Sequence, residues 1–224
     1  MSDPPPGDAA LTYTSYLALE EVLGAQRPRS DEHDEVVFIV VHQVHELWFK
    51  QLLHELAHAQ VLLEDGRTAP VVHTLRRELT ILKVVVAQID VLETMTPRQF
   101  TGFRDRLAAS SGFQSAQFRE LEAVLGRRDP AMLDAQSATS SARERIGAAM
   151  ARPSVYDSFL RHLSSHGFAV PEQLLARDVT APPARRPQID EVLLAVYADD
   201  GGPAQVCERL VDLDEGLQEW RYAT

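Results

Sequence analysis

Apolar residues recur along most of this chain at the spacing of an α-helix. Between Asp34 and Gln60 this spacing places them on one side of a helix, at positions 37, 40, 41, 44, 48, 52 and 56. The same spacing continues from Pro70 to Glu93 and predicts a second long helix. No segment alternates with the period of two that a half-buried strand requires. The pattern therefore predicts an all-α fold, a helical bundle of about eight to ten helices.

Capping and turn residues divide the remainder of the chain into shorter helices. Thr96 followed by Pro97 is a typical helix start, because threonine caps the first turn and proline fits its first position. Residues 1–10 are rich in proline and polar residues, so we expect a disordered tail there. The rest of the chain, residues 11–224, is predicted to form a single all-helical domain.

Charge and cysteine content exclude several classes of protein. The formal net charge is −11, and an acidic chain binds nucleic acids and anionic membranes poorly. No apolar run approaches the roughly 20 residues that a membrane-spanning helix needs. The single cysteine, Cys207, suits a reducing compartment, and residues 1–10 lack a basic region followed by an apolar one. We therefore expect a cytoplasmic protein with no nucleic-acid and no membrane partner.

A histidine follows the most apolar part of the first long helix. Every side chain from Val36 to Val41 is apolar, so we expect this part to be buried on all sides. His42 comes next, and burying its polar ring costs free energy unless the ring finds a partner. Two interpretations remain open: a core histidine bonded to a neighbour, and a pocket histidine aimed at a ligand.

Two long motifs resemble the signatures of a known family. The first, which begins at Phe38, is F-I-x-x-H-Q-x-x-E-L-W-F-K. The second, over residues 92–115, is L-E-T-M-T-P-x-x-F-x-G-F-R-D-x-L-x-x-S-S-G-F-Q-S. Both resemble tryptophan 2,3-dioxygenases, which belong to a superfamily of heme-dependent aromatic oxygenases. The resemblance implies an all-helical homo-oligomer, a dimer or tetramer, that oxidises tryptophan or an indole derivative with O2 and heme.

The resemblance also implies roles for individual residues. His42 matches the catalytic histidine beside the indole nitrogen, and Phe38 matches the aromatic wall against the indole ring. Arg104 matches the arginine that holds the substrate carboxylate, a task that suits its planar fork. Ser111 matches a loop serine near substrate and heme. Family members usually carry tyrosine where this chain has Phe100, so we expect altered substrate binding through the loss of one hydroxyl.

The segment L-T-Y-T-S-Y-L, residues 11–17, is similar to the N-terminal arm of the same family. In that family the arm reaches into a neighbouring subunit and lines its active site. Tyr13, Tyr16 and Leu17 share one helical face, so they either pack on their own core or complete the pocket of a partner. The resemblance implies the second arrangement, an exchange of N-terminal arms between copies of the chain.

The last helix bears on how heme is held. The resemblance places the axial heme histidine at Thr224, and the helix predicted over 203–222 contains no histidine. We therefore expect that no histidine of this helix holds heme. Heme iron prefers a histidine, a thiolate or a similar donor, and the alternative donors are His42, His45, His54 and His58. Two further hypotheses are a heme-free relative that uses another metal or no cofactor, and a non-catalytic protein that binds an aromatic amino acid.

Two pairs of histidines stand four residues apart. His54 and His58 fit the H-E-x-x-H pattern of zinc proteases, but this short pattern is common by chance, and the pair faces away from His42. We retain both as weak metal-ligand candidates. His162 and His166 could share a ligand. A position near a helix C-terminus, however, favours exposed and positively charged side chains, so we expect both to lie on the surface.

Overall fold

The computed structural model describes four stretches of the chain, residues 11–107, 115–134, 136–184 and 186–223. All regular structure within them is helical, with twelve α-helices, eight of which have eight or more residues. The prediction of an all-α bundle is confirmed. Within the same stretches, no helix is both long enough and apolar enough to cross a membrane. The expected tail over 1–10 lies outside the described residues.

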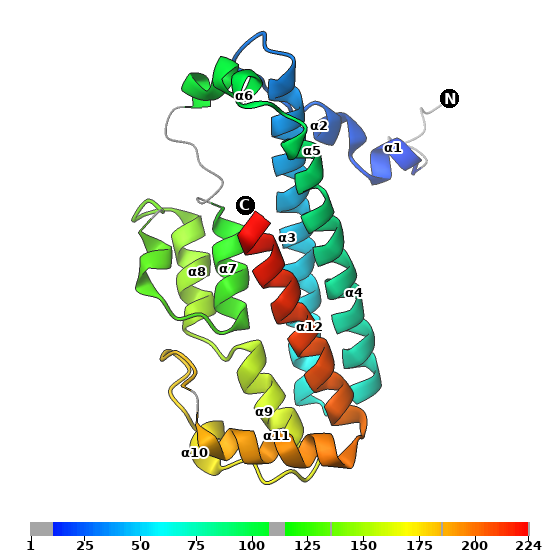
Figure 1. Cartoon of the computed structure of the whole chain (residues 1–224), viewed down its shortest axis with the longest axis vertical. Helices are drawn as coiled ribbons and strands as arrows, with labels where there is room; N and C mark the ends of the chain where they lie inside the picture. The colour runs from blue at the N-terminus through cyan, green and yellow to red at the C-terminus, as the bar shows by residue number, and fades with distance from the viewer. Residues whose placement is uncertain (1–10, 108–114, 135, 185, 224) are drawn as a thin grey trace, which may run out of the picture.

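Three long helices form the body of the molecule, α3 (Asp34–Glu64), α4 (Thr68–Ala87) and α12 (Gly202–Ala223). Helix α4 packs against both α3 and α12, and the three run side by side (Figure 1). Helix α3 begins where the sequence predicts and continues one turn past Gln60. The predicted second helix is interrupted at Gln88 and forms α4 and α5.

The remaining helices are shorter and surround the long ones. Helices α7, α8 and α9 lie along one side of the body, and α11 runs across its lower end (Figure 1). The bounds of the short helices are α1 (Tyr13–Tyr16), α2 (Leu19–Leu23), α5 (Ile89–Glu93), α6 (Pro97–Arg104), α7 (Ala116–Leu125), α8 (Ser141–Met150), α9 (Val155–Ser165), α10 (Glu172–Leu175) and α11 (Pro187–Asp199), with 3-10 turns at Asp105–Leu107 and Pro130–Leu133.

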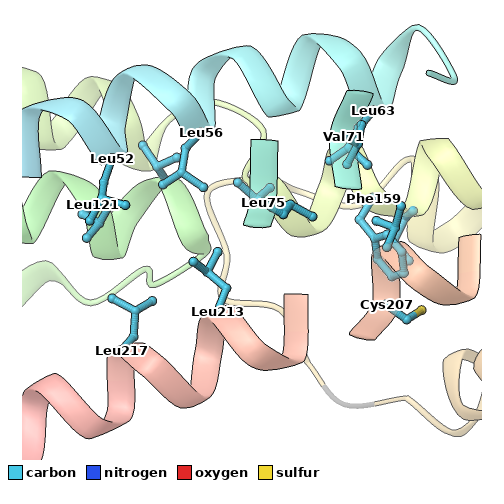
Figure 2. Packing of buried hydrophobic residues seen from close by; sticks show 14 of the residues in the cluster. Leu52, Leu56, Leu63, Val71, Leu75, Leu121, Phe159, Cys207, Leu213 and Leu217 are labelled. Carbon is cyan, nitrogen blue, oxygen red and sulfur yellow. The ribbon is translucent and has the colours of Figure 1, made fainter. Parts of the chain in front are cut away.

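Apolar side chains from α3, α4, α7, α9 and α12 meet in one connected core. Figure 2 labels ten of its members, Leu52, Leu56, Leu63, Val71, Leu75, Leu121, Phe159, Cys207, Leu213 and Leu217. Each fully buried leucine contributes about 2 kcal/mol relative to an exposed one, so this seam is the main source of stability. Burial raises the pKa of the Cys207 thiol to about 11, which keeps it protonated and unreactive.

Helix α6 is fixed at the beginning of α3. Thr96 and Gln99 form a reciprocal capping box, with the Thr96 backbone N–H donating to Gln99 Oε1 at 2.8 Å. This confirms the predicted helix start. Gly102 faces Glu32, and a Cβ added at Gly102 would lie 3.1 Å from Glu32 Cδ. The glycine thus permits a close approach that brings α6 against the N-terminal end of α3 (Figure 1).

The first turns of α3 are buried on one side only. Val36 is 44% exposed and Val40 is 38% exposed, whereas Val41 is 6% exposed. The prediction that residues 36–41 are buried on all sides is wrong, because the described elements cover only the face that carries Val41. An apolar face left open in this way is typical of a surface that binds a partner.

His162 is wholly buried, contrary to the prediction of a surface position. Helix α9 packs against α3, and His162 Nδ1 lies 3.1 Å from the carbonyl oxygen of Leu63 near the end of α3. His166, which follows α9, is exposed as predicted. The four-residue spacing puts both rings on one face of α9, but the position of α3 decides how deeply each is buried.

One buried carboxyl group of the bundle has no hydrogen-bond partner among the described residues. Glu78 in α4 is 0% exposed, and neither of its carboxylate oxygens has such a partner. The negative charge of Glu55 in α3 also repels a charged Glu78. Glu55 itself forms an ion pair with Arg77 at 2.9 Å. Burial, and to a lesser degree the charge of Glu55, raises the pKa of Glu78 well above its ordinary value. The neutral acid is therefore the favoured form.

Replacing Glu78 with leucine should stabilise the fold. An unsatisfied buried polar group costs about 1–3 kcal/mol, so Glu78→Leu should raise the free energy of unfolding by about that amount in urea titrations at neutral pH. Because the pKa of Glu78 is higher in the folded chain than in the unfolded chain, the parent protein should lose stability as pH rises from the ordinary glutamate value to the raised one.

The Glu78→Leu variant should lack that pH dependence. Glu93→Leu, at an exposed glutamate, is the control and should change the free energy of unfolding little. A Glu78→Leu protein that is less stable than the parent at every pH would contradict the interpretation.

Candidate active site

The first turns of α3 and helix α6 bring four rings together. The centroid of the Phe38 ring lies 4.1 Å from that of His42, 5.9 Å from that of Phe100 and 5.5 Å from that of Phe103. Phe100 and Phe103 meet edge to face at 5.4 Å, a favourable arrangement of aromatic rings. We call these four residues the ring cluster. It unites the two sequence motifs, which are far apart along the chain.

His42 has one nitrogen satisfied within its own helix. Its Nδ1 lies 2.7 Å from the carbonyl oxygen of Phe38. A carbonyl oxygen only accepts, so Nδ1 carries the hydrogen and Nε2 of the neutral ring carries a lone pair. The ring is half-buried. The contact with Phe38 agrees with the interpretation of a histidine bonded to a neighbour, and Nε2 of the neutral ring remains an acceptor.

Arg104 lies at the open edge of the ring cluster. Its guanidinium carbon is 6.0 Å from the centroid of the Phe100 ring, within the range of a cation–π contact. The residue is exposed. The structure thus links Arg104 to His42 through Phe100 and Phe38, with the charged group toward solvent and the imidazole toward the core.

Phe103 belongs to the ring cluster, although the sequence motifs alone predict no role for it. It is 0% exposed and touches both Phe38 and Phe100. Its position three residues after Phe100 in the same short helix was a usable signal, because residues three apart share a helix face. Phe103 fixes the orientation of α6 and so sets where Phe100 and Arg104 lie.

The other residues expected at the site are not part of the ring cluster. Ser111 and Thr224 lie outside the described residues. Tyr13 and Tyr16 are 76% and 71% exposed, and Leu17 is 39% exposed. Their helix, α1, projects sideways from the body (Figure 1), so these three side chains do not pack on their own core.

A row of rings continues from His42 toward the end of α12. His45 lies 6.2 Å from His42, Phe49 lies 6.3 Å from His45, and Trp220 lies 5.3 Å from Phe49. His45 Nε2 is 3.2 Å from the carbonyl oxygen of Val85. Burial, followed by the charge of His42, lowers the pKa of His45. His45 is therefore a neutral ring bound to α4.

Glu122 of α7 binds three arginines, of which Arg221 comes from the end of α12. Glu122 is only 3% exposed and accepts hydrogen bonds from Arg119 at 2.5 Å, Arg127 at 2.8 Å and Arg221 at 2.6 Å. The pKa of Arg127 is raised, chiefly by its hydrogen bond to Asp129. The sequence does not reveal this cluster, because Arg221 and Glu122 are brought together only by packing.

Two further contacts that the sequence did not reveal hold α3 in place. Buried Glu35 accepts hydrogen bonds from the backbone N–H groups of Arg29 at 2.7 Å and Ser30 at 2.8 Å. The Ser30 side chain is the main cause of the lowered pKa of Glu35. Gln117 of α7 donates to the Glu46 backbone oxygen at 2.9 Å. Both contacts fix the register of the helix that carries Phe38 and His42.

The H-E-x-x-H segment has a structural partner on α4. His54 and His58 are exposed, while Glu55 is 4% exposed and faces the interior. Glu55 accepts hydrogen bonds from Gln51 at 2.7 Å and from Arg77 at 2.9 Å. The glutamate of the motif therefore belongs to an ion pair between α3 and α4. Within the described residues, no cluster of three metal-binding side chains is present.

A groove of about 460 Å³ lies elsewhere, between α9, α11 and α12. Its walls are mostly apolar and include Phe159, Leu193 and Leu210, with Asp214 and Glu215 among its polar members. None of the residues predicted for the site lines it. The ring cluster, rather than this groove, is where the sequence motifs converge.

Comparisons with known proteins agree with the two motifs. Residues 6–145 match the family model described as tryptophan 2,3-dioxygenase. A protein of that name from Anaeromyxobacter sp. is 60% identical over 99% of this chain and 83% of its own length. Those from Herpetosiphon aurantiacus and Caulobacter vibrioides are 52% and 42% identical, each over 95% of this chain and 82% of their own length. The chain therefore belongs to the tryptophan 2,3-dioxygenase family.

Proposed function

We propose that this protein oxidises tryptophan with O2, as an oxygenase that uses heme. The observation that carries the proposal is the ring cluster, in which both family motifs meet. Apolar rings from α3 and α6 flank an imidazole with an acceptor nitrogen, and a guanidinium lies at the open edge. This is the set of groups that an indole bearing an amino-acid end requires.

Each group has a definite task in substrate binding. The Nε2 lone pair of His42 accepts the indole N–H, because Nδ1 is already committed to the Phe38 carbonyl. Phe38 and Phe100 form apolar walls that exclude water from the indole ring. Arg104 binds the substrate carboxylate through paired N–H donors. With phenylalanine at position 100, the pocket offers the substrate no hydroxyl there.

The described residues include apolar rings of the kind that pack against heme. Heme needs apolar contacts for its faces, and the aromatic rings of the ring cluster are groups of that kind. The histidines of α3 differ as possible donors. The Nε2 lone pair of His42 serves the indole N–H, His45 is bonded to α4, and His54 and His58 lie in solvent. Heme, when bound, supplies the iron centre that activates O2.

We further propose that the chain works as a homo-oligomer in which N-terminal arms are exchanged. Tyr13, Tyr16 and Leu23 are each more than 70% exposed on α1 and α2. Val36 and Val40 leave an apolar face open on α3. Large apolar side chains grouped on a surface favour association, so docking the arm of one copy beside the ring cluster of another would cover both surfaces.

Heme addition and replacement of His42 test the activity. Purified protein with added heme should develop a strong Soret absorption band and consume tryptophan in the presence of O2. His42→Ala should lower kcat/KM for tryptophan by about 10²-fold or more, within the range for a positioned proton acceptor. His54→Ala, at an exposed position on the same helix, should retain activity. A protein with neither a Soret band nor tryptophan consumption would contradict the proposal and favour a heme-free binding protein.

Replacement of Arg104 tests how the substrate is held. Arg104→Ala should raise KM for tryptophan by about 10- to 100-fold, since a hydrogen bond to a charged group contributes about 1.5–3 kcal/mol. Indole, which lacks the carboxylate, should bind both proteins equally. Arg98→Ala, at an exposed arginine of α6, is the matched control and should leave KM unchanged. Equal KM values for the parent and Arg104→Ala would refute the assignment.

Deletion of residues 1–17 tests the exchanged arm. The shortened chain should form a smaller assembly in sedimentation experiments and bind tryptophan more weakly. The deletion removes the arm that would join two copies and would also cover the α3 face beside the ring cluster. Tyr222→Ala, which removes another highly exposed tyrosine at 90% exposure, should change neither property. An unchanged assembly with unchanged tryptophan affinity would rule out the exchange.

A further inference from the structure

Two histidine rings converge on one hydroxyl group where α9 meets the start of α4. His162 Nε2 lies 3.3 Å from Thr68 Oγ1, and His166 Nε2 lies 3.1 Å from the same oxygen. The two ring centroids are 4.2 Å apart. This junction is separate from the ring cluster, and the four-residue spacing noted in the sequence accounts for the shared direction of the rings.

Both rings are oriented by their other nitrogen. His162 Nδ1 lies 3.1 Å from the carbonyl oxygen of Leu63, and His166 Nδ1 lies 2.8 Å from the carbonyl oxygen of His162. Since carbonyl oxygens only accept, both Nδ1 atoms carry the hydrogen. Both Nε2 atoms of the neutral rings are then bare lone pairs. This is the arrangement that usually prepares histidines to bind a metal ion.

The hydroxyl of Thr68 cannot satisfy both lone pairs. It carries one hydrogen, so it donates to only one of the two Nε2 atoms. The other Nε2 faces the hydroxyl oxygen with no hydrogen between them. Two lone pairs and an oxygen that meet in this way favour a cation among them.

The surroundings keep His162 in the form that binds metals. Burial, followed by the nearby His166, lowers the pKa of His162, and a neutral imidazole is the form that coordinates a metal. The last carbonyl groups of α9 give this end of the helix partial negative charge, which favours a cation. The neighbouring charges of Glu64 and Arg161 are paired with each other at 2.9 Å.

We propose that His162, His166 and the Thr68 hydroxyl form a binding site for a divalent transition-metal ion of the zinc class. Two imidazole nitrogens suit zinc, nickel and copper ions rather than magnesium or calcium. Among the described residues, no third histidine, cysteine or carboxylate joins the pair, so water completes the coordination. The ion links the C-terminus of α9 to the start of α4, and its role is structural.

Titration of the full chain with Zn²⁺, followed by calorimetry, tests the site. His166→Asn should weaken Zn²⁺ binding by at least about tenfold, since even the loss of an outer partner of a ligand typically costs that much. His166 is exposed and lies after the last residue of α9, so this variant should keep the circular dichroism of the parent. Thr68→Val preserves the shape of the side chain and should weaken Zn²⁺ binding by a smaller factor.

The second histidine pair provides the matched control. His54 and His58 are also four residues apart but are exposed. His58→Asn should therefore leave the Zn²⁺ affinity of the His162–His166 site unchanged. If His58→Asn abolished this binding while His166→Asn kept it, the proposal would be wrong.

An NMR titration of the unmodified chain with Zn²⁺ tests the site without any substitution. Zn²⁺ should shift the ring resonances of His162 and His166 together. Rings that respond to pH but not to Zn²⁺ would show a proton site only and would overturn the proposal.

Discussion

The burial of one long face of α3 is the constraint on which the rest of the structure depends. This helix has 31 residues and spans about 45 Å, and α4, α7, α9 and α6 all pack against it. Leucines at 52, 56 and 63 belong to the connected core that these helices share (Figure 2). Among the described residues, α6 packs against its N-terminal turns, and the ring cluster forms there.

Among the described residues, the buried charged side chains have hydrogen-bond partners, with Glu78 as the exception. Glu122 binds three arginines, and Asp157 binds Arg177 at 2.6 Å together with the backbone N–H of Ser154. Arg221 and Arg177 come from parts of the chain distant from these carboxylates, and removing one partner of a buried ion pair leaves the other charge poorly compensated. Glu78 avoids that cost by remaining protonated, at the expense of unsatisfied oxygens.

The second contact of each histidine decides what the ring can do. His42 Nδ1 donates to the Phe38 carbonyl oxygen of its own helix, which leaves Nε2 as an acceptor at the ring cluster. His45, one turn further along, gives Nε2 to α4 and becomes a packing residue. His162 and His166 both donate from Nδ1 to backbone carbonyl oxygens, and their Nε2 atoms both face the Thr68 hydroxyl. Spacing along the helix is similar in all these cases, so the hydrogen-bond partner makes the difference.

The sequence by itself determined the helical class, the start of α3, the capped start of α6 and the residues of the two motifs, because periodicity and capping are local properties. It did not determine which helix faces are covered. Val36 and Val40 are exposed although their segment is wholly apolar, and His162 is buried although its segment ends a helix. Phe103 and the partners of Glu122 were likewise decided by packing, since burial depends on which elements meet, and that depends on the whole chain.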